Sequence, residues 1–338
     1  MTDRLRDRGE RALLEAIRRL IPRGRGVRLG PGDDAAVLAP VRSPLLLTTD
    51  AMVERVHFRS RWLSPRDLGR RAFEVSASDV AAMGGRVVAA VLALTAPPTL
   101  PVASLRAMMA GVRDGACAAG GALVGGNLAS GSDLSLTLTV LGTAASRPVT
   151  RAGARAGDQL FVTGTLGGAG LGLRSLMGAR SISGAATAVG RWRRPRARLR
   201  AGAALARHGV AVAMIDLSDG LLIDADRLCA ASGVAARIDA DRLPLARPLR
   251  DLAPARAREL ALAGGEDYEL LFAVRPARVA TLYAARAALG CQVTRVGEVV
   301  AGRGVTVLAG GRVIAAGAAF GYEHFRRSPR RRRRTETA

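Results

Sequence analysis

Hydrophobic and polar residues in the first half of the chain follow a helical period in some segments and a strand period in others. Leu13, Ile17 and Leu20 share one side of a helix over residues 9–20. Leu alternates with Ser or Thr over residues 134–142, as in a half-buried strand. Further strands are predicted at 35–38, 45–49, 87–95 and 122–124, and further helices at 64–83 and 102–119. Such a mixture predicts a sheet with helices on one face.

The helix over residues 64–83 has the clearest boundaries in the chain. Ser64 is a suitable N-cap, Pro65 fits the first turn, and Asp67 is an acidic third residue. The pair Gly84-Gly85 is expected to end the helix.

Residues 144–158 contain few apolar side chains and are typical of a link to a second domain. The glycine-rich segment 164–173 is predicted to be a tight turn from strand to helix, and residues 179–190 a surface loop. Strands are predicted at 160–163, 212–217, 234–239, 268–274, 292–299 and 304–316, and helices at 195–207, from 219, at 255–263 and at 278–289. The expected fold class is therefore α/β (α+β) with two domains.

The composition is typical of a globular protein, and its bias toward arginine accounts for much of the positive charge. Of 338 residues, 49% are hydrophobic but only 3% aromatic, so Ala, Val and Leu must build the core. The formal charge of +23 comes with no lysine at all, which indicates a compositional bias toward arginine as much as a polyanionic partner. Residues 326–338 are rich in arginine and lack apolar residues, so we expect a disordered tail capable of nonspecific nucleic-acid contact.

The cellular setting is predicted to be the reducing cytoplasm. Cys117, Cys229 and Cys291 lie far apart and form no CxxC pair, so they are interpreted as small buried hydrophobic residues. The charged N-terminus does not resemble a signal peptide, and no apolar stretch is long enough to cross a membrane.

Acidic residues occur where structure alone would not favour them. Asp33 and Asp34 follow a Gly-Pro-Gly turn, and Asp50 closes an apolar strand. At 100° per residue, Asp79 falls within about 60° of the apolar stripe of its helix. A carboxylate on such a stripe must be partnered, and oxygen ligands suit hard divalent cations.

The second half repeats this arrangement. Asp216-Leu217-Ser218-Asp219-Gly220 ends a predicted strand and opens a helix, where phosphate and metal can both bind. Each acid alone can be read as a turn residue, a strand-end cap or an arginine partner. Together they favour metal-assisted phosphoryl transfer.

Other phosphate and catalytic motifs are missing or weak. A Walker motif is impossible without lysine, and the Gly-x-Gly spacings of residues 164–173 lack the acidic residue expected about 20 positions later. His57, His208 and His324 are too dispersed for a zinc triad, and no Ser-His-Asp arrangement is evident. Hydrolysis by a nucleophilic side chain is therefore unsupported.

Six segments in a fixed order carry a resemblance to a known family. They read GPGDDAAVL, LLLTTDAMVERVHF, SDVAAMGG, GGN, IDLSDGL and GGEDYELLF. From about residue 28 to Phe325 the chain resembles the thiamine-monophosphate kinase family, which belongs to the aminoimidazole-ribonucleotide synthetase superfamily. The resemblance implies a two-domain fold of that superfamily, with an N-terminal ATP- and metal-binding domain over 1–148 that pairs into a homodimer. A C-terminal α/β domain would cover 149–325.

The resemblance also implies a reaction and a set of site residues. ATP would phosphorylate thiamine monophosphate to thiamine diphosphate with several Mg²⁺ ions. The metal ligands would be Asp34, Thr48, Thr49, Asp50, Asp79, Asp216, Asp219 and Asn127, with Asp50, Asp79 and Asp219 central to catalysis. Contacts to ATP would come from Gly126, Asn127, Arg151 and Ser218, and contacts to the thiamine substrate from His57, Glu266 and Phe320.

One position departs from the family pattern. Gly125-Gly126-Asn127-Leu128 stands where the family usually has GGDT. Asparagine keeps an oxygen ligand but lacks the charge of aspartate, so one metal ion is expected to bind more weakly.

Three other functions fit parts of the sequence. Another ATP-using synthetase of the superfamily is possible, but selenophosphate synthetase has a reactive Cys or selenocysteine near its start, and here the first cysteine is Cys117. A nucleic-acid-binding protein would interleave aromatic residues with arginine, and aromatics are scarce. A noncatalytic subunit is suggested only by Asn127.

Overall fold

The computed structural model describes residues 3–8, 10–22, 24–31, 35–145, 147–178 and 184–317. Asp33, Asp34, Phe320, His324 and the tail 326–338 lie outside these ranges, so the predictions made for them are not addressed by the structure.

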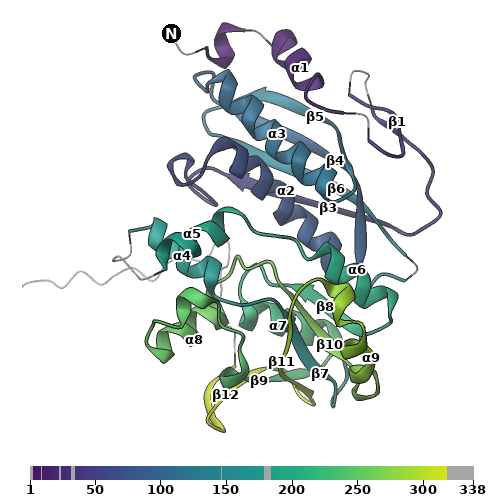
Figure 1. The fold of residues 1–338 in the computed structure, drawn as a ribbon, viewed down its shortest axis with the longest axis vertical. Coiled ribbons are helices and arrows are strands. Elements are labelled where there is room, and N and C mark those ends of the chain that lie inside the picture. The colour runs from purple at the N-terminus through teal and green to yellow at the C-terminus, as the bar shows by residue number, and fades with distance from the viewer. Residues whose placement is uncertain are drawn as a thin grey trace, which may run out of the picture.

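A four-stranded sheet forms the centre of the N-terminal half (Figure 1). Its spatial order is β3-β6-β4-β5, antiparallel except for the parallel pair β4 and β5. The strands are β3 (Leu45–Val53), β4 (Gly85–Ala96), β5 (Ala122–Ser130) and β6 (Ser135–Ala144). Helices α2 (Pro65–Ala82) and α3 (Val102–Ala118) pack against each other and on one face of it.

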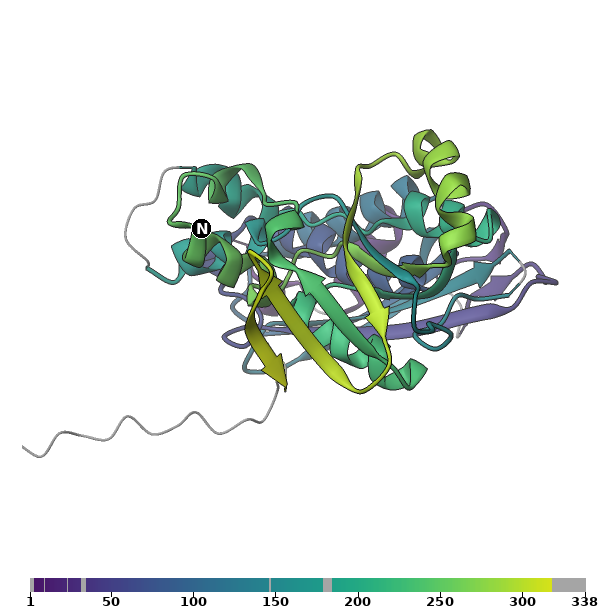
Figure 2. The ribbon, with the colours of Figure 1, turned by 90° about the horizontal axis from the view of Figure 1, so that it is seen from below.

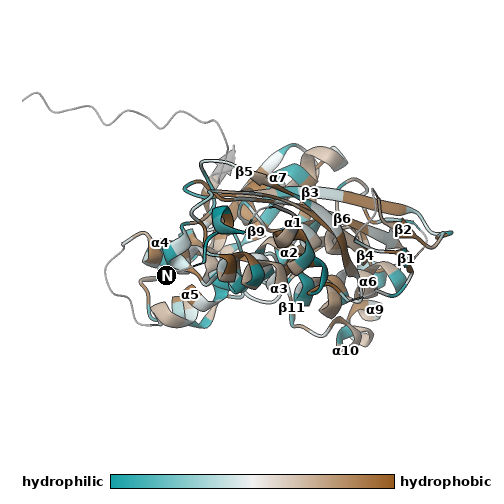
Figure 3. Cartoon of the chain, turned by 90° about the horizontal axis from the view of Figure 1, so that it is seen from above, coloured by the Kyte–Doolittle hydropathy of each residue, from teal (hydrophilic) through white to brown (hydrophobic). Residues whose placement is uncertain are grey.

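Strand alternation separates the two faces of this sheet. On β3 the even-numbered residues, such as Leu46 and Met52, are buried under the helices, while the odd-numbered Leu45 and Leu47 are exposed on the open face. The strands carry long hydrophobic stretches, drawn brown in Figure 3. At the margin of the domain lie α1 (Glu10–Arg18), β1 (Val27–Leu29) and β2 (Val37–Leu38), with short 3₁₀ turns at Leu5–Asp7 and Ser60–Trp62.

A seven-stranded mixed sheet forms the C-terminal half, in the order β13-β12-β9-β11-β7-β10-β8. Its strands are β7 (Gln159–Thr163), β8 (Ala211–Asp216), β9 (Ala235–Asp239), β10 (Leu270–Val274), β11 (Val293–Val300), β12 (Gly304–Ala309) and β13 (Arg312–Gly317). Figure 2 shows this half in front, with the yellow hairpin β12–β13 at one edge.

Seven helices accompany this sheet in the described part of the chain. They are α4 (Gly168–Leu176), α5 (Ala185–Arg193), α6 (Leu199–Arg207), α7 (Leu221–Ser232), α8 (Pro254–Ala263), α9 (Val279–Ala284) and α10 (Arg286–Leu289). Short 3₁₀ turns lie at Ala240–Arg242, Arg247–Leu249 and Pro276–Arg278.

Helix α2 joins the two halves. A Cβ on Gly202 of α6 would lie 2.0 Å from the backbone oxygen of Ala81, so only glycine allows this close contact. Ala81 and Ala82 share a buried cluster with residues of the C-terminal sheet. The end of α2 is therefore fixed against the second half of the molecule.

The helix boundaries predicted at Ser64 and Gly84 are confirmed, since the Ser64 hydroxyl accepts from the Asp67 N–H and α2 ends at Ala82. The prediction of a surface loop over 179–190 was wrong from residue 185 onward. That stretch belongs to α5, because Trp192 at its end needs burial and is fully enclosed. The strand predicted at 304–316 is a hairpin that turns at Gly310-Gly311.

The cysteines are only partly as predicted. Cys229 is buried and Cys291 is half-buried, but Cys117 is exposed near the end of α3. It lies on the solvent side of that helix, whose packed side is formed by residues such as Val112 and Ala116. No helix among the described residues is both long and apolar enough to span a bilayer.

Candidate active site

Two adjacent residues of α2 connect acidic groups from both halves of the molecule. The Thr48 hydroxyl of β3 donates to Asp79 at 2.5 Å, and the Ser78 hydroxyl donates to Asp216 at 2.8 Å. Asp216 is the last residue of β8. The sequence prediction that Asp79 lies on an inward helix face is thus matched by a site at the junction of the two sheets.

Burial and mutual repulsion perturb the carboxyl groups of this site. Burial raises the pKa of Asp216 to about 7, and the charge of Asp79 adds to the rise, while the bond from Ser78 opposes it. Burial likewise raises the pKa of Asp50 to about 6, again with a contribution from Asp79 and an opposing hydrogen bond from Ser76. The carboxylates of Asp50, Asp79 and Asp216 therefore repel one another electrostatically, and the site holds an excess of negative charge.

The chemistry of these groups fits a hard cation. One oxygen of Asp50 is buried and has no hydrogen-bond partner, which leaves it available to a ligand. The neighbouring donors are carboxylate and hydroxyl oxygens, the ligands that Mg²⁺ prefers. Within the described ranges, however, no three His, Cys, Asp or Glu side chains lie close enough together to hold a metal ion as they stand. A complete coordination sphere would need further oxygen ligands.

The segment Asp216–Gly220 and the loop Gly264–Glu269 lie against each other. The Glu266 N–H donates to the Ser218 carbonyl at 2.7 Å, and the Tyr268 N–H donates to the Leu217 carbonyl at 2.9 Å. Glu266 and Tyr268 both have positive φ, which costs energy and is kept by these bonds. Two motifs about 50 residues apart in the sequence therefore form one rigid wall of the site.

Asp219 is partly neutralised within the protein. Arg227 contacts its carboxylate at 2.5 Å and also pairs with Asp224. Asp224 accepts the N–H groups of Asp219 and Gly220 at 3.0 and 3.1 Å. Those two donors, which the sequence suggested for phosphate, are already bonded at the start of α7.

A buried arginine lies beside the predicted substrate residue Glu266. Arg71 of α2 is 1% exposed and forms an ion pair with the Glu266 carboxylate. Its guanidinium carbon lies 4.4 Å from the ring centre of Trp192 and 6.0 Å from that of Tyr268. Burial lowers the pKa of Arg71 to about 10, but it stays cationic at neutral pH. The carboxylate and the two rings form a cation-binding environment that Arg71 fills.

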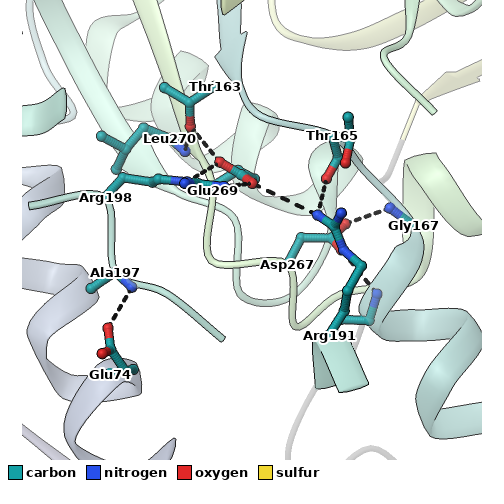
Figure 4. Close-up of polar contacts among 11 residues, drawn as sticks. Glu74, Thr163, Thr165, Gly167, Arg191, Ala197, Arg198, Asp267, Glu269 and Leu270 are labelled. Carbon is teal, nitrogen blue, oxygen red and sulfur yellow. Dashed lines mark hydrogen bonds and ion pairs between the residues drawn. The ribbon is translucent and has the colours of Figure 1, made fainter. Parts of the chain in front are cut away.

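A buried carboxylate in the same loop, Glu269, fixes the segment that carries Glu266 (Figure 4). Arg198 binds both of its oxygens, at 2.5 and 2.6 Å, and the Thr163 hydroxyl donates at 2.7 Å. Arg191 of α5 lies 4.0 Å away and also donates to the Thr165 carbonyl. Glu269 thereby ties the loop to β7, α5 and the start of α6.

Asp267 of the same loop closes the N-terminus of α4. Its carboxylate accepts from the Gly167 and Ala169 N–H groups at 2.6 and 3.1 Å. The glycine-rich segment is therefore the tight strand-to-helix turn expected from the sequence, and its free donors are used inside the protein.

Two of the predicted metal ligands lie on the other face of the N-terminal sheet. Thr49 accepts from Thr139 at 3.0 Å on the open face, and Asn127 is exposed there on β5. Gly126 allows the backbone to approach β4, since a Cβ would lie 2.0 Å from the Leu92 oxygen. The structure does not bring the Thr49 and Asn127 side chains to Asp79.

The other predicted residues lie around the site at varying distance. His57 follows β3, half-buried, and its Nδ1 accepts from the Val53 N–H at 3.0 Å. Arg151 is exposed, next to Thr150, whose carbonyl accepts from the Met214 N–H at 2.9 Å on β8. Phe320 is outside the described residues.

Sequence reasoning missed Arg71, Glu269 and Arg198. Glu269 lies within the GGEDYELLF segment, but nothing in its spacing indicates that its charge is buried. Arg71 lies three residues after Leu68 on the inward side of α2. This spacing could have predicted that Arg71 is buried and pairs with an acidic residue.

The chain is similar to known proteins over most of its length. Residues 32–144 match the family model described as AIR synthase related protein, N-terminal domain. Residues 155–310 match AIR synthase related protein, C-terminal domain. A thiamine-monophosphate kinase from Mycobacterium tuberculosis (strain H37Rv) is 38% identical over 275 residues, which are 79% of this chain and 81% of that protein.

Solved structures give the same result. The thiamine-monophosphate kinase of Stenotrophomonas maltophilia K279a is 34% identical with a TM-score of 0.78, covering 87% of this chain and 95% of that one. The structure described as AaThiL complexed with AMPPCP and TMP is 32% identical with a TM-score of 0.73, covering 96% of this chain and all of that one.

Proposed function

The chain belongs to the thiamine-monophosphate kinase family, and from this premise we propose that it transfers the γ-phosphoryl group of ATP to thiamine monophosphate, giving thiamine diphosphate and ADP. The observation that carries the proposal is that two adjacent residues of α2 contact both halves of the molecule. Asp79 accepts a hydrogen bond from Thr48, and Ser78 donates one to Asp216. Carboxylates alone would repel two anionic reactants, so a group of acids at this position suits the reaction only if cations bind there.

The carboxylates of Asp50, Asp79 and Asp216, with the Thr48 hydroxyl, would hold Mg²⁺. When bound, Mg²⁺ neutralises phosphate charge and helps to keep the reacting groups in line. The excess negative charge and the unpartnered oxygen of Asp50 support this assignment. Asp219 and Asp34 would complete this ligand set. Thr49 and Asn127, which lie on the open face of the sheet, would hold a metal ion apart from it.

The acceptor is already a phosphate and is largely deprotonated near pH 7, so the reaction requires no strong general base. The protein therefore acts by holding and orienting both substrates. Arg151 and Ser218, with Gly126, would contact ATP. Glu266, kept in place by Arg71 and by the Glu269 network, would recognise the thiamine group together with His57 and Phe320.

A direct assay tests the proposal. Purified full-length protein is incubated with ATP, Mg²⁺ and thiamine monophosphate, and the products are separated by chromatography. We expect thiamine diphosphate and ADP in equal amounts, no product with excess EDTA, and recovery on adding Mg²⁺. Turnover of ATP only with a different acceptor would refute the proposal.

The open face of the N-terminal sheet would be the surface of a homodimer. Leu47 is 73% exposed on it, and Leu45 and Val91 are exposed beside it. A hollow of about 1440 Å³, larger than a typical small-molecule site, reaches this face at Leu47 and Thr139 and is also lined by α1 and the segment around β1 and β2. An apolar sheet face of this extent is unfavourable in water and suits a second copy of the same sheet.

Leu47→Glu is expected to convert the dimer into a monomer, because each copy would bury an unpaired carboxylate in the interface. Sedimentation equilibrium would measure the change. Val313→Glu is the matched control, since Val313 is 60% exposed on the C-terminal hairpin, and it should leave the association state unchanged. A variant Leu47→Glu that stays as associated as the parent would exclude this face.

Asn127→Asp is expected to keep the activity and lower the Mg²⁺ concentration needed for half-maximal rate, because a carboxylate binds Mg²⁺ more strongly than an amide. Initial rates over a Mg²⁺ series at fixed ATP would measure it. An unchanged Mg²⁺ requirement would mean that Asn127 is not a ligand.

A further inference from the structure

A second hollow lies between the two halves of the molecule, away from the site described above. It has a volume of about 740 Å³ and is lined by parts of α2, α3, α6 and α10 and by the start of β4. Glu74 is its single acidic lining residue. Five arginines line it: Arg70, Arg86, Arg196, Arg200 and Arg207. We call it the arginine groove.

Most of the positive charge in the arginine groove is not compensated. Arg70 pairs with Glu74 at 2.6 Å, and Arg200 donates to the carbonyls of Ala287 and Ala288. The side chains of the remaining three, Arg86, Arg196 and Arg207, make no hydrogen bond or ion pair with any residue in the described ranges. Three free guanidinium groups around one concavity repel one another and favour an anion between them.

The walls of the groove add an apolar component. Leu199 contributes hydrophobic surface, Phe73 is almost fully buried, and the other lining residues are mainly alanines with one glycine. Small side chains leave room for a bound group, and the volume lies in the range of small-molecule sites. A cluster of arginines around an apolar floor suits a ligand that carries both phosphates and an organic ring. A nucleic acid would instead favour an extended open surface.

From these features we propose that the arginine groove is a separate binding site for an organic diphosphate, either ADP or thiamine diphosphate. None of its lining residues belongs to the aspartate cluster of Asp50, Asp79 and Asp216, and it shares no lining residue with the hollow beside the N-terminal sheet. Binding in the groove therefore needs no metal ion and stays possible in a dimer formed through the open face of that sheet.

Hydrogen bonds connect the arginine groove to the loop Gly264–Glu269, which carries the proposed substrate residue Glu266 (Figure 4). The Glu74 carboxylate accepts from the Ala197 N–H at 2.8 Å, and the next residue, Arg198, holds the buried Glu269. A phosphate that draws Arg70 or Arg196 toward itself acts directly on this segment. Occupancy of the groove is expected to alter the KM for thiamine monophosphate, a readout that rests on the proposed function.

Calorimetric titration of the full-length protein tests the binding itself, without any activity. ADP, thiamine diphosphate and inorganic pyrophosphate are titrated separately in the presence of EDTA, which removes the metal-dependent site. We expect one site per chain, with an organic diphosphate bound more tightly than pyrophosphate. Arg86→Gln, Arg196→Gln and Arg207→Gln combined should weaken it at least about 30-fold, since hydrogen bonds to charged groups are the strong ones. Whichever of ADP and thiamine diphosphate binds with the lower Kd is the ligand of the groove.

The matched control combines Arg250→Gln, Arg303→Gln and Arg312→Gln, which remove the same charge from exposed positions of the C-terminal half. This control should bind like the parent. Equal weakening in both triple variants would show a general effect of net charge and overturn the proposal. So would the absence of binding in EDTA, or displacement of the diphosphate by a single-stranded oligonucleotide at lower concentration.

Discussion

Asp79→Asn is expected to reduce thiamine diphosphate formation to below about 1% of the parent rate, because preorganised charge at the reacting groups is among the largest catalytic contributions. Asp79 is bonded to Thr48, and its charge acts on both Asp50 and Asp216. Asparagine keeps the size and can still accept from Thr48. It cannot supply the negative charge with which Asp79 would hold Mg²⁺ under the proposed function.

The same substitution should not destabilise the free protein. The charge of Asp79 raises the pKa of Asp216 and Asp50, which means that the three ionised groups repel one another in the folded state. Removing one charge relieves this repulsion, so the melting temperature without Mg²⁺ should stay equal or rise. The increase in melting temperature caused by Mg²⁺ and ATP together should be smaller than in the parent.

Asp67→Asn is the matched control for Asp79→Asn, because Asp67 lies on the same helix and has an arginine partner, Arg194, near the surface. It should keep nearly full activity and lose at most about 1 kcal/mol of stability. A fully active Asp79→Asn variant would contradict the proposed role of this helix face. Loss of activity in both variants would point to disturbance of α2 rather than to a missing charge.

The sequence was sufficient for the parts of the site that follow from local periodicity. The position of Asp79 was predicted from the helical angle alone, and the caps of α2 from Ser64 and the glycine pair. Strand alternation could also have separated Thr48 from Thr49, since adjacent strand residues point to opposite faces. The resemblance instead treated both threonines as one ligand pair.

Other features depend on contacts between segments far apart in the chain. The environment of Arg71 is completed by Trp192, more than 100 residues later, near the end of helix α5, which begins inside the predicted loop 179–190. The partners of Glu269 come from β7, α5 and the residue before α6. No local pattern specifies which of 51 basic residues will be buried beside a given acid. The two halves must first be packed against each other.

The buried Glu269 should be among the most sensitive positions for stability. Glu269 is 1% exposed, and Glu269→Gln would leave Arg198 without its bidentate partner. Breaking a buried pair from one side costs about 3–5 kcal/mol, since the remaining charge loses its counterion. Urea unfolding in the absence of substrates would measure the loss. Glutamine still accepts from Thr163, so the effect reports on the charge and not on the hydroxyl bond.

Three further variants test whether the loss comes from the buried ion pair. Glu259→Gln is the control, because Glu259 also contacts two arginines, Arg174 and Arg256, but its side chain is 47% exposed. It should cost less than about 1 kcal/mol. Arg198→Met should cost as much as Glu269→Gln, and the double variant should cost clearly less than the sum, because neither charge is then left alone. Additive losses would mean that the two side chains contribute independently and that their ion pair does not hold the loop.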